Sequence, residues 1–263
     1  MKIGVYSNPI KDIDNSVRDK VFAAVKICGA TAEPYVSGEK YDFIVCVGGD
    51  GTILRIAKDS AKYAIPILGV NMGTVGFLTE VEPGSVSEAI ERIIRRDFIL
   101  ERRALIDAQM GEKHFYALND VVVRSNNGRM ISMEVRVGGA IIDRFTCDGY
   151  IACTPTGSTA YSLSAGGSVI APNTPVIALT PVNPHTLRTR PVVVGSFEDI
   201  ILSNTGSSEA SVYVDGECTA CLKPKQSISI TGWDMSALFV RFENKSFYSR
   251  LLDKLNAWSN TEG

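Results

Sequence analysis

The chain has 263 residues, of which 45% are hydrophobic and 21% charged, and its formal net charge is −2. This supports a large core or two modest domains and excludes a general electrostatic attraction to nucleic acid or anionic lipid. No apolar run approaches the roughly 20 residues of a membrane helix, and the short apolar N-terminus is not a signal peptide, so we expect a cytoplasmic protein without a membrane partner.

The first hundred residues alternate predicted strands and helices. We expect strands at 2–6, 44–47 and 65–70. Helices are expected after Asn15 as a cap, after the glycine-rich turn at 48–52, and from a capping box at Ser85 and Glu88. Gly29 should end the first helix, and Pro66 should stand early in its strand or in an edge strand. The alternation predicts an α/β N-terminal domain with a parallel sheet over residues 1–98.

After Arg96 the pattern changes to short strands separated by turns. The alternation is clearest at 131–137, where every second residue is polar. We expect an all-β, sandwich-like C-terminal domain over residues 99–242. Residues 243–263 should form a segment that packs back on the N-terminal domain, and 247–258 within it show helical spacing. The predicted strands are 98–110, 114–124, 131–142, 150–154, 176–182, 190–194, 199–203, 211–215, 226–231 and 237–242.

One strand-to-helix turn carries the strongest chemical signal. A β-branched run at 43–47 leads into Gly48-Gly49-Asp50-Gly51-Thr52 and then into a helix, at the edge where open α/β sheets bind ligands. The glycines permit positive φ and lack a Cβ, so amides can approach phosphate closely. A carboxylate repels phosphate, so Asp50 should accept a proton or position a metal. The alternative is that Asp50 caps the helix with help from Thr52.

Two later stretches have polar residues beside buried strands. Asn119 and Asp120 precede an apolar run, where they could read a nucleoside or simply form a turn. Residues 148–167 join a short apolar strand to a loop rich in hydroxyls and glycines, which suits a nucleoside slot. Cys218 and Cys221 form a lone pair without a second one, so we predict free thiols and no protein metal site.

These motifs resemble those of known kinases. Residues 48–52 resemble the signature shared by NAD kinases, diacylglycerol and sphingosine kinases and, more distantly, 6-phosphofructokinases. Lipid kinases do not share the stretch Thr154-Pro155-Thr156-Gly157-Ser158-Thr159-Ala160-Tyr161. The ordered set closely resembles NAD kinases from Val45 to Gly216. It comprises 48–52, 69–78, 119–120, 148–149, 154–167, 184–187, 190–191 and 214–216.

The resemblance implies a two-domain enzyme that transfers the γ-phosphoryl of ATP to the 2′-hydroxyl of the adenosine ribose of NAD. Asp50 would accept the hydroxyl proton, and Mg²⁺ or another divalent cation would arrive with ATP. The implied phosphate-binding residues are Gly48, Gly49, Gly51, Thr52 and Arg55. The implied NAD-binding residues are Asn119, Asp120, Arg129, Thr146, Asp148, Thr156, Thr159, Ala160, Tyr161, Ser162, Leu163, Ser164 and Asp215.

The same resemblance divides these residues between the two halves of NAD. Asn119 and Asp120 would hold the adenosine half, and 159–161 would line its pocket. Asp148 and Ser164 would hold the nicotinamide half across a subunit interface, because the family forms dimers and tetramers; we therefore expect a homodimer or homotetramer.

One position departs from the family pattern. Many members carry Arg or Lys where this chain has Thr146, which leaves the choice between NAD and NADH open and favours NAD with tolerance of NADH. Two other functions compete with an NAD kinase. A lipid kinase needs an apolar groove, for which 154–167 are too polar, and a nucleotide sensor has no need of Asp50.

Overall fold

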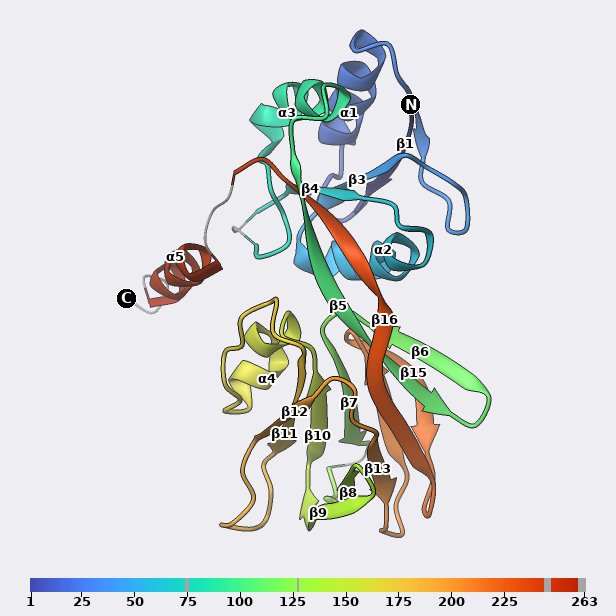
Figure 1. The fold of residues 1–263 in the computed structure, drawn as a ribbon, viewed down its shortest axis with the longest axis vertical. Helices are drawn as coiled ribbons and strands as arrows, with labels where there is room; N and C mark the ends of the chain where they lie inside the picture. Colours follow the sequence, from blue (N-terminus) through green and yellow to red (C-terminus); the bar gives the residue numbers. More distant parts are fainter. Residues whose placement is uncertain (74–75, 127, 244–246, 260–263) are drawn as a thin grey trace. The chain divides into compact units, whose positions relative to one another are not determined.

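The structure is a computed structural model that describes residues 1–73, 76–126, 128–243 and 247–259 (Figure 1). Residues 74–75 of the glycine-punctuated loop at 69–78, and 244–246 and 260–263 of the C-terminal segment, lie outside the described residues. The chain forms two compact units, one of residues 1–103 and 236–263 and the other of residues 104–235. Residues 99–103 and 236–242, which were predicted to belong to the second domain, lie in the first unit.

A parallel sheet forms the centre of the first unit. Its strands run in the order β2-β1-β3-β4-β16, and each described pairing between neighbours is parallel. This confirms the predicted α/β fold. Pro66 lies just before β4, which is an inner strand, so of the two positions expected for it the start of a strand fits and the edge does not. There, outside the ladder, a proline withholds no strand hydrogen bond. The strands are β1 Lys2–Ser7, β2 Thr31–Pro34, β3 Phe43–Gly48, β4 Ile67–Asn71 and the end of β16 Ser227–Arg241.

Helices cover both faces of this sheet. α1 (Ser16–Ile27) and α3 (Val86–Ile94) lie side by side on one face, where they share a core with alternate residues of β3, and α2 (Asp50–Tyr63) follows β3 on the other (Figure 1). Every residue of β3 is buried as a result. The unbroken apolar run at 43–47 is therefore a consequence of burial on two sides. A fourth helix, α5 (Phe247–Ser259), follows β16 in the chain.

The start of α1 differs from the prediction. Asn15 has a left-handed backbone with φ of 57° and makes no side-chain cap. Asp12 serves instead, because its carboxylate accepts the amides of Val17 at 3.1 Å and Arg18 at 3.0 Å. Ser85 also makes no side-chain cap for α3, which is entered from a 3-10 turn, η1 Pro83–Ser85, so the predicted capping box was wrong.

The second unit is a sandwich of two antiparallel layers, as predicted. One layer has the order β12-β11-β10-β7-β14-β15, and the other contains β9-β8-β13 with the first part of β16, and β5 with β6. Side chains from both layers share one core. The strands are β5 Ile99–Met110, β6 Lys113–Ala117, β7 Asp120–Ser125, β8 Ile131–Val137, β9 Ala140–Cys147, β10 Gly149–Cys153, β11 Val176–Val182, β12 Val192–Gly195, β13 Ile200–Asn204, β14 Ala210–Val214 and β15 Glu217–Leu222.

Several predicted strand boundaries were wrong for local reasons. The run at 131–142 is a hairpin, because Gly138 and Gly139 take positive φ of 54° and 82° and turn the chain. The run at 114–124 is two strands, and residues 226–231 and 237–242 belong to one strand that continues through Gly232. β15 was missed. No helix within the described ranges is both long enough and apolar enough to cross a membrane.

The cap at Asp12 gives a stability prediction. Its side chain is buried and also accepts the Ser7 hydroxyl at 2.8 Å, so Asp12→Ala would leave two helix amides and that hydroxyl without an acceptor. We expect a loss of about 2 kcal/mol in the free energy of unfolding, measured by urea denaturation. The matched control is Asp14→Ala, whose exposed carboxylate accepts the Ser16 amide and which should hardly change the midpoint. Equal effects of the two would contradict the assignment.

Candidate active site

The turn between β3 and α2 is held by the side chain of Thr52. Gly49 is the N-cap residue of α2, and its amide donates to Thr52 Oγ1 at 3.3 Å. Asn8, which follows β1, donates to the same hydroxyl oxygen through Nδ2 at 3.0 Å. Residues 48–52 therefore form one fixed turn at the carboxyl end of the sheet, where the first amides of α2 can bind an anion.

The glycines of this turn are needed for space. None of Gly48, Gly49 and Gly51 has positive φ, so that part of the expectation was wrong. A Cβ on Gly48 would lie 2.3 Å from Thr52 Oγ1, and one on Gly49 would lie 2.7 Å from Lys11 Nζ. A Cβ on Gly51 would meet nothing within 4 Å. Gly48 thus lets the turn close on Thr52, and Gly51 borders open space.

Asp50 points away from its own helix. Its Oδ2 accepts the amide of Phe77 at 2.9 Å, and its Oδ1 accepts the amide of Leu78 at 3.1 Å. The capping alternative was therefore wrong, because the carboxylate binds the segment after β4 instead of the first turn of α2. Gly76 allows this approach, since a Cβ there would lie 2.1 Å from Oδ1.

The segment that holds Asp50 is itself held by Arg241. This guanidinium is 2% exposed, and it donates to the carbonyls of Phe77, Leu78 and Thr79 at 3.0 to 3.2 Å. It also pairs with Glu80 Oε2 at 3.0 Å. Residues 77–79 are consequently fixed on one side by a cation and on the other by the Asp50 carboxylate.

Sequence reasoning missed several residues around this turn. Asn71 ends β4 beside Gly48, and its Oδ1 is buried with no partner recorded in the described part of the chain. Lys254, on α5, places Nζ 3.5 Å from Asp50 Oδ2. Asn71 could have been found from its place at a strand end before a glycine loop. Lys254 carried no such signal. The predicted Arg55 is exposed on α2.

In the second unit, Asp215 organises the backbone around Asn119. Its Oδ2 accepts the amide of Leu118 at 2.8 Å, and its Oδ1 accepts those of Asn119 at 2.7 Å and Asp120 at 3.2 Å. Asp215 also has positive φ, at 48°. Both of its oxygens are engaged, so we interpret Asp215 as the residue that positions 118–120 and not as a direct ligand contact.

Asp120, unlike Asp215, has a carboxylate that a ligand could bind. It is 6% exposed, and within the described residues no donor to its carboxylate is recorded. Burial, and then the charge of Asp215, raise the pKa of Asp120 to about 7. Burial likewise raises the pKa of Asp215 to about 6, against the three amides that lower it. A buried carboxylate without donors is a place where ligand hydroxyls would bind.

The loop after β10 packs directly on Asn119. The amide of Thr154 donates to the Asn119 carbonyl at 2.9 Å, and the Thr154 hydroxyl donates to the Leu118 carbonyl at 2.5 Å. A Cβ on Gly157 would lie 2.1 Å from the Asn119 carbonyl oxygen, so only glycine fits. The structure therefore brings the 118–120 turn into contact with the Thr-Pro-Thr-Gly stretch; both contain residues that were predicted to bind NAD.

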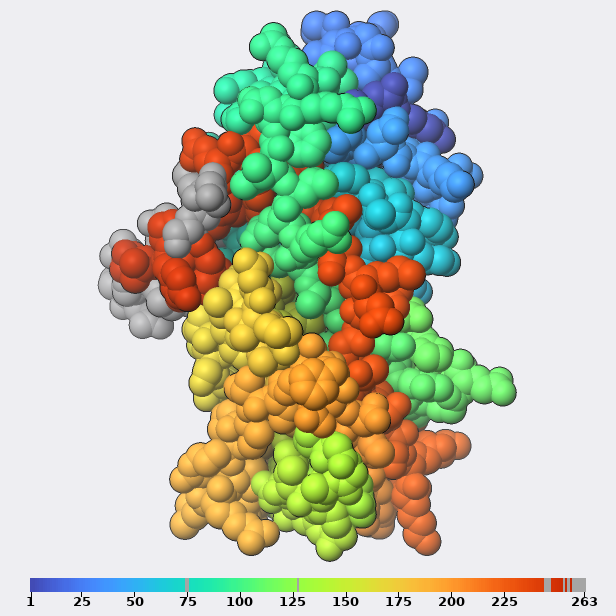
Figure 2. All heavy atoms as spheres, in the orientation of Figure 1, coloured from blue at the N-terminus to red at the C-terminus, as the bar shows by residue number. Residues whose placement is uncertain are grey.

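The hydroxyls of this loop differ in what they can contact. Ser162 is fully buried and bonds Thr180 Oγ1 at 2.8 Å, and Thr159 donates to the Thr156 carbonyl at 3.2 Å. These groups hold η2 (Gly157–Thr159) and α4 (Tyr161–Ser164) in place. Tyr161 and Ser164 are exposed, Ala160 and Leu163 are half-buried, and Thr156 is buried. The loop and α4, yellow in Figure 2, reach the surface of this unit.

Three predicted residues lie at the opposite end of the β7–β10 ladder. Cys153 of β10 pairs with Asp120, whereas Gly149 pairs with Arg124, so Asp148 is roughly 16 Å from Asp120 along the strand. Asp148 accepts Asn183 Nδ2 at 3.0 Å. Thr146 is half-buried in β9, and Arg129 is exposed. Within one chain these residues do not join the 118–120 site.

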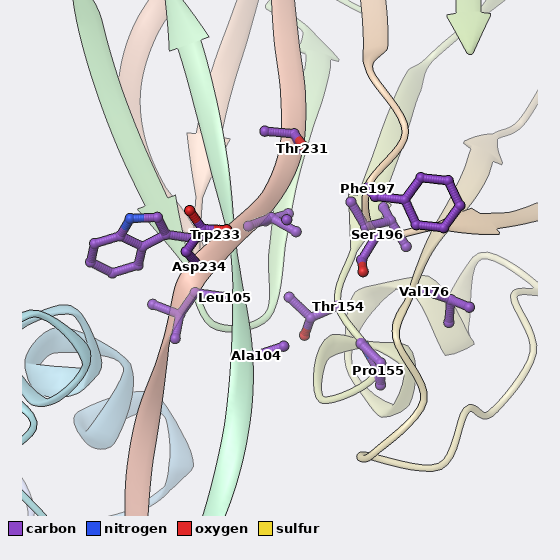
Figure 3. A pocket seen from close by; sticks show the side chains of 13 residues that line it. Ala104, Leu105, Thr154, Pro155, Val176, Ser196, Phe197, Thr231, Trp233 and Asp234 are labelled. Atoms are coloured by element: carbon purple, nitrogen blue, oxygen red, sulfur yellow. The ribbon is translucent and has the colours of Figure 1, made fainter. Parts of the chain in front are cut away.

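A cavity of about 360 Å³ opens in the second unit behind Thr154 and Pro155 (Figure 3). Phe197 and Ser196 lie on one side of it, and Trp233, whose ring stacks on Tyr116 at 4.1 Å, marks the other. None of Asn119, Asp120 and Tyr161 lines it. The cavity therefore does not coincide with the predicted residues. Among the described residues no group of three His, Cys, Asp or Glu side chains could hold a metal ion.

Comparison with known families identifies the family to which the residues around Asp50 and those around Asn119 belong. Models of the ATP-NAD kinase N-terminal and C-terminal domains match residues 31–98 and 118–242. The chain belongs to the ATP-NAD kinase family. The match confirms the resemblance drawn from the motifs, and all of those motifs fall inside the matched segments.

Relatives of this ATP-NAD kinase family member cover almost its full length. The NAD kinase of Caldicellulosiruptor bescii is 31% identical over 97% of this chain and 99% of its own. The crystal structure of an NAD kinase from Archaeoglobus fulgidus in complex with ATP is 31% identical, with a TM-score of 0.82 over 97% of this chain and 99% of that one. Yeast NADH kinase complexed with NADH, at 21% identity and a TM-score of 0.87 over 97% and 87%, shows the same fold.

The raised pKa of Asp120 predicts a pH-dependent stability. Its pKa of about 7 in the folded protein exceeds the ordinary 3.8, so its contribution to stability is full below pH 4 and is lost as pH rises through 7. Asp120→Asn should remove this loss. Its free energy of unfolding should exceed that of wild type by about 2 kcal/mol at pH 8 and equal it at pH 4. Urea titrations at several pH values would measure it. Asp215→Asn, which weakens three amide contacts, should destabilise the protein at every pH. If the free energy of unfolding varied with pH in the same way for Asp120→Asn and wild type, the assignment would be contradicted.

Proposed function

We propose that this chain transfers the γ-phosphoryl of ATP to the 2′-hydroxyl of the adenosine ribose of NAD, and that Asp50 accepts the hydroxyl proton. The observation that carries the proposal is the Asp50 carboxylate, which two backbone amides hold at the strand-to-helix turn while its side chain stays 27% exposed. Family membership supports the reaction, as does the relative solved with ATP.

The mechanism follows from the two sides of the turn. The amides at the start of α2 suit the phosphates, because a helix N-terminus favours negative charge. Asp50 orients the acceptor hydroxyl and receives its proton; a carboxylate suffices for this because the proton leaves late in a loose transition state. A divalent cation, Mg²⁺ in our proposal, neutralises charge on the phosphates and would be held by them, since the described residues include no cluster of three protein ligands.

The adenosine half of NAD would bind in the second unit. Asn119 can pair with an adenine edge, and Asp120 can accept a hydrogen bond from the ribose hydroxyl that does not react. Asp215 fixes the backbone of both residues and Thr154 packs beside them, so the site is formed before the ligand arrives. The exposed ring of Tyr161 is then available to line the pocket.

The nicotinamide half would be bound by Asp148 of a second subunit. Within one chain the two carboxylates lie at opposite ends of the ladder, roughly 16 Å apart, so Asp148 does not join the 118–120 site of its own chain. We therefore propose a homodimer or homotetramer. With Thr146 in place of a cation, NAD is the proposed substrate, and NADH is tolerated.

The first test is a coupled assay for NADP formed from NAD and Mg·ATP. Wild type should form NADP, and Asp50→Asn should lose at least about 10²–10³-fold in kcat while it still folds and binds NAD. Absence of NADP from folded wild type would overturn the proposed reaction, and lipid acceptors would be tested next. Equal rates for both proteins would overturn the role of Asp50 alone.

Gly76 provides a second test, in which no catalytic side chain is substituted. Gly76→Ala would put a Cβ 2.1 Å from Asp50 Oδ1 and displace the carboxylate, so kcat should fall about as far as in Asp50→Asn. Gly84→Ala is the matched control, because a Cβ there meets nothing within 4 Å. NADP formation and NAD binding should be measured for both. A fully active Gly76→Ala protein would contradict the geometry of the carboxylate.

A further inference from the structure

Helix α5 directs one face at the segment that holds Asp50. Phe247 lies 6.1 Å from Phe77 between ring centroids, and Arg250 Nη2 lies 3.2 Å from Glu80 Oε2. Lys254 Nζ lies 3.5 Å from Asp50 Oδ2. Positions 247, 250 and 254 share one face of a helix. The helix thus contacts residues 77–80 twice and then reaches the carboxylate itself.

The position of Lys254 distinguishes the two oxygens of Asp50. Its ammonium lies 4.3 Å from the centroid of the Phe77 ring, and the amide of Phe77 donates to the same Oδ2 that Lys254 approaches. On the other oxygen, Oδ1, the described residues place the Leu78 amide alone. A carboxylate oxygen can accept two hydrogen bonds, so Oδ1 keeps an acceptor position for a substrate hydroxyl.

We propose that Lys254 is a positioning residue for phosphoryl transfer, which holds Oδ2 of Asp50 and so presents Oδ1 to the acceptor hydroxyl. This rests on the proposed function. Lys254 also offsets the negative charge of Asp50, which would otherwise repel the incoming γ-phosphoryl group at short range. Its side chain is 21% exposed and lies against an aromatic ring, where the charge is less screened than in open water.

The step balances without another reactant. The 2′-hydroxyl oxygen forms a bond to the γ-phosphorus, and the bond from that phosphorus to the β–γ bridging oxygen breaks. ADP leaves with the electron pair, and the hydroxyl proton passes to Asp50 Oδ1. Lys254 keeps its protons throughout, so it acts through the orientation and charge of Asp50 and does not take part in the proton transfer.

Arg250 supplies a matched control on the same helix. Lys254→Met and Arg250→Met each remove one cation from α5, but Arg250 contacts Glu80 and not Asp50. At saturating ATP, Lys254→Met should lower kcat about 10- to 100-fold with KM for NAD within about threefold of wild type. Arg250→Met should keep kcat within about threefold. Lys254→Arg, which keeps the charge, should recover part of the loss. Melting temperatures would be measured for all three variants.

The outcomes separate the inference from the proposed function. Inactive wild type would overturn the proposed function and with it this inference, whereas active wild type with an equally active Lys254→Met protein would overturn this inference alone. Equal losses of kcat and of melting temperature in both methionine variants would reduce Lys254 to an anchor of the helix. A Lys254→Met protein with higher kcat or lower KM for ATP would show that α5 obstructs the site, which would also overturn the inference.

Discussion

The buried guanidinium of Arg241 is the interaction on which the candidate active site of the first unit depends. It binds three successive carbonyls, those of Phe77, Leu78 and Thr79, and it pairs with Glu80 and with Glu101 at 2.6 Å. A buried cation persists only when its hydrogen bonds are satisfied, and here carbonyls and carboxylates surround it. Because the carbonyls of 77–78 are fixed toward Arg241, the amides of the same segment are free to hold Asp50. The orientation of the carboxylate is thus set by a residue that need not approach a substrate.

The second unit uses the same kind of contact in the opposite sense. There the carboxylate of Asp215 is the support, and the backbone of 118–120 is the part held in place. Its cost is visible in the positive φ of Asp215 and in the raised pKa values of Asp120 and Asp215. Unfavourable features of this kind persist where the surrounding structure fixes them, and they concentrate at binding sites.

Sequence reasoning succeeded where the deciding contacts are local. The buried strand β3, the glycine turn and the start of α2 could be predicted because an apolar run, glycines and helical spacing all lie within about twenty residues. It failed where a distant segment decides. Asp215 lies 97 residues from Leu118, and Lys254 lies on a helix at the other end of the chain from Asp50, so no spacing in the sequence predicts either contact. The predicted cap of α1 was wrong although the contact is local, because Asp12 reaches past Asn15 to the helix amides.

The second unit also explains why this chain should select a nucleoside over a lipid, although both kinds of kinase share the glycine turn. An apolar chain could not provide donors to the buried carboxylate of Asp120, and covering that group without donors would be unfavourable. A ribose offers a second hydroxyl beside the one that reacts. In the loop after β10, the hydroxyls of Ser162 and Thr159 form hydrogen bonds within the protein, and Tyr161 is exposed. The loop therefore presents an aromatic ring and backbone groups instead of an apolar groove. In the proposed function, selectivity would reside in a carboxylate that only a hydrogen-bonding substrate can satisfy, while the glycine turn would supply the chemistry common to both.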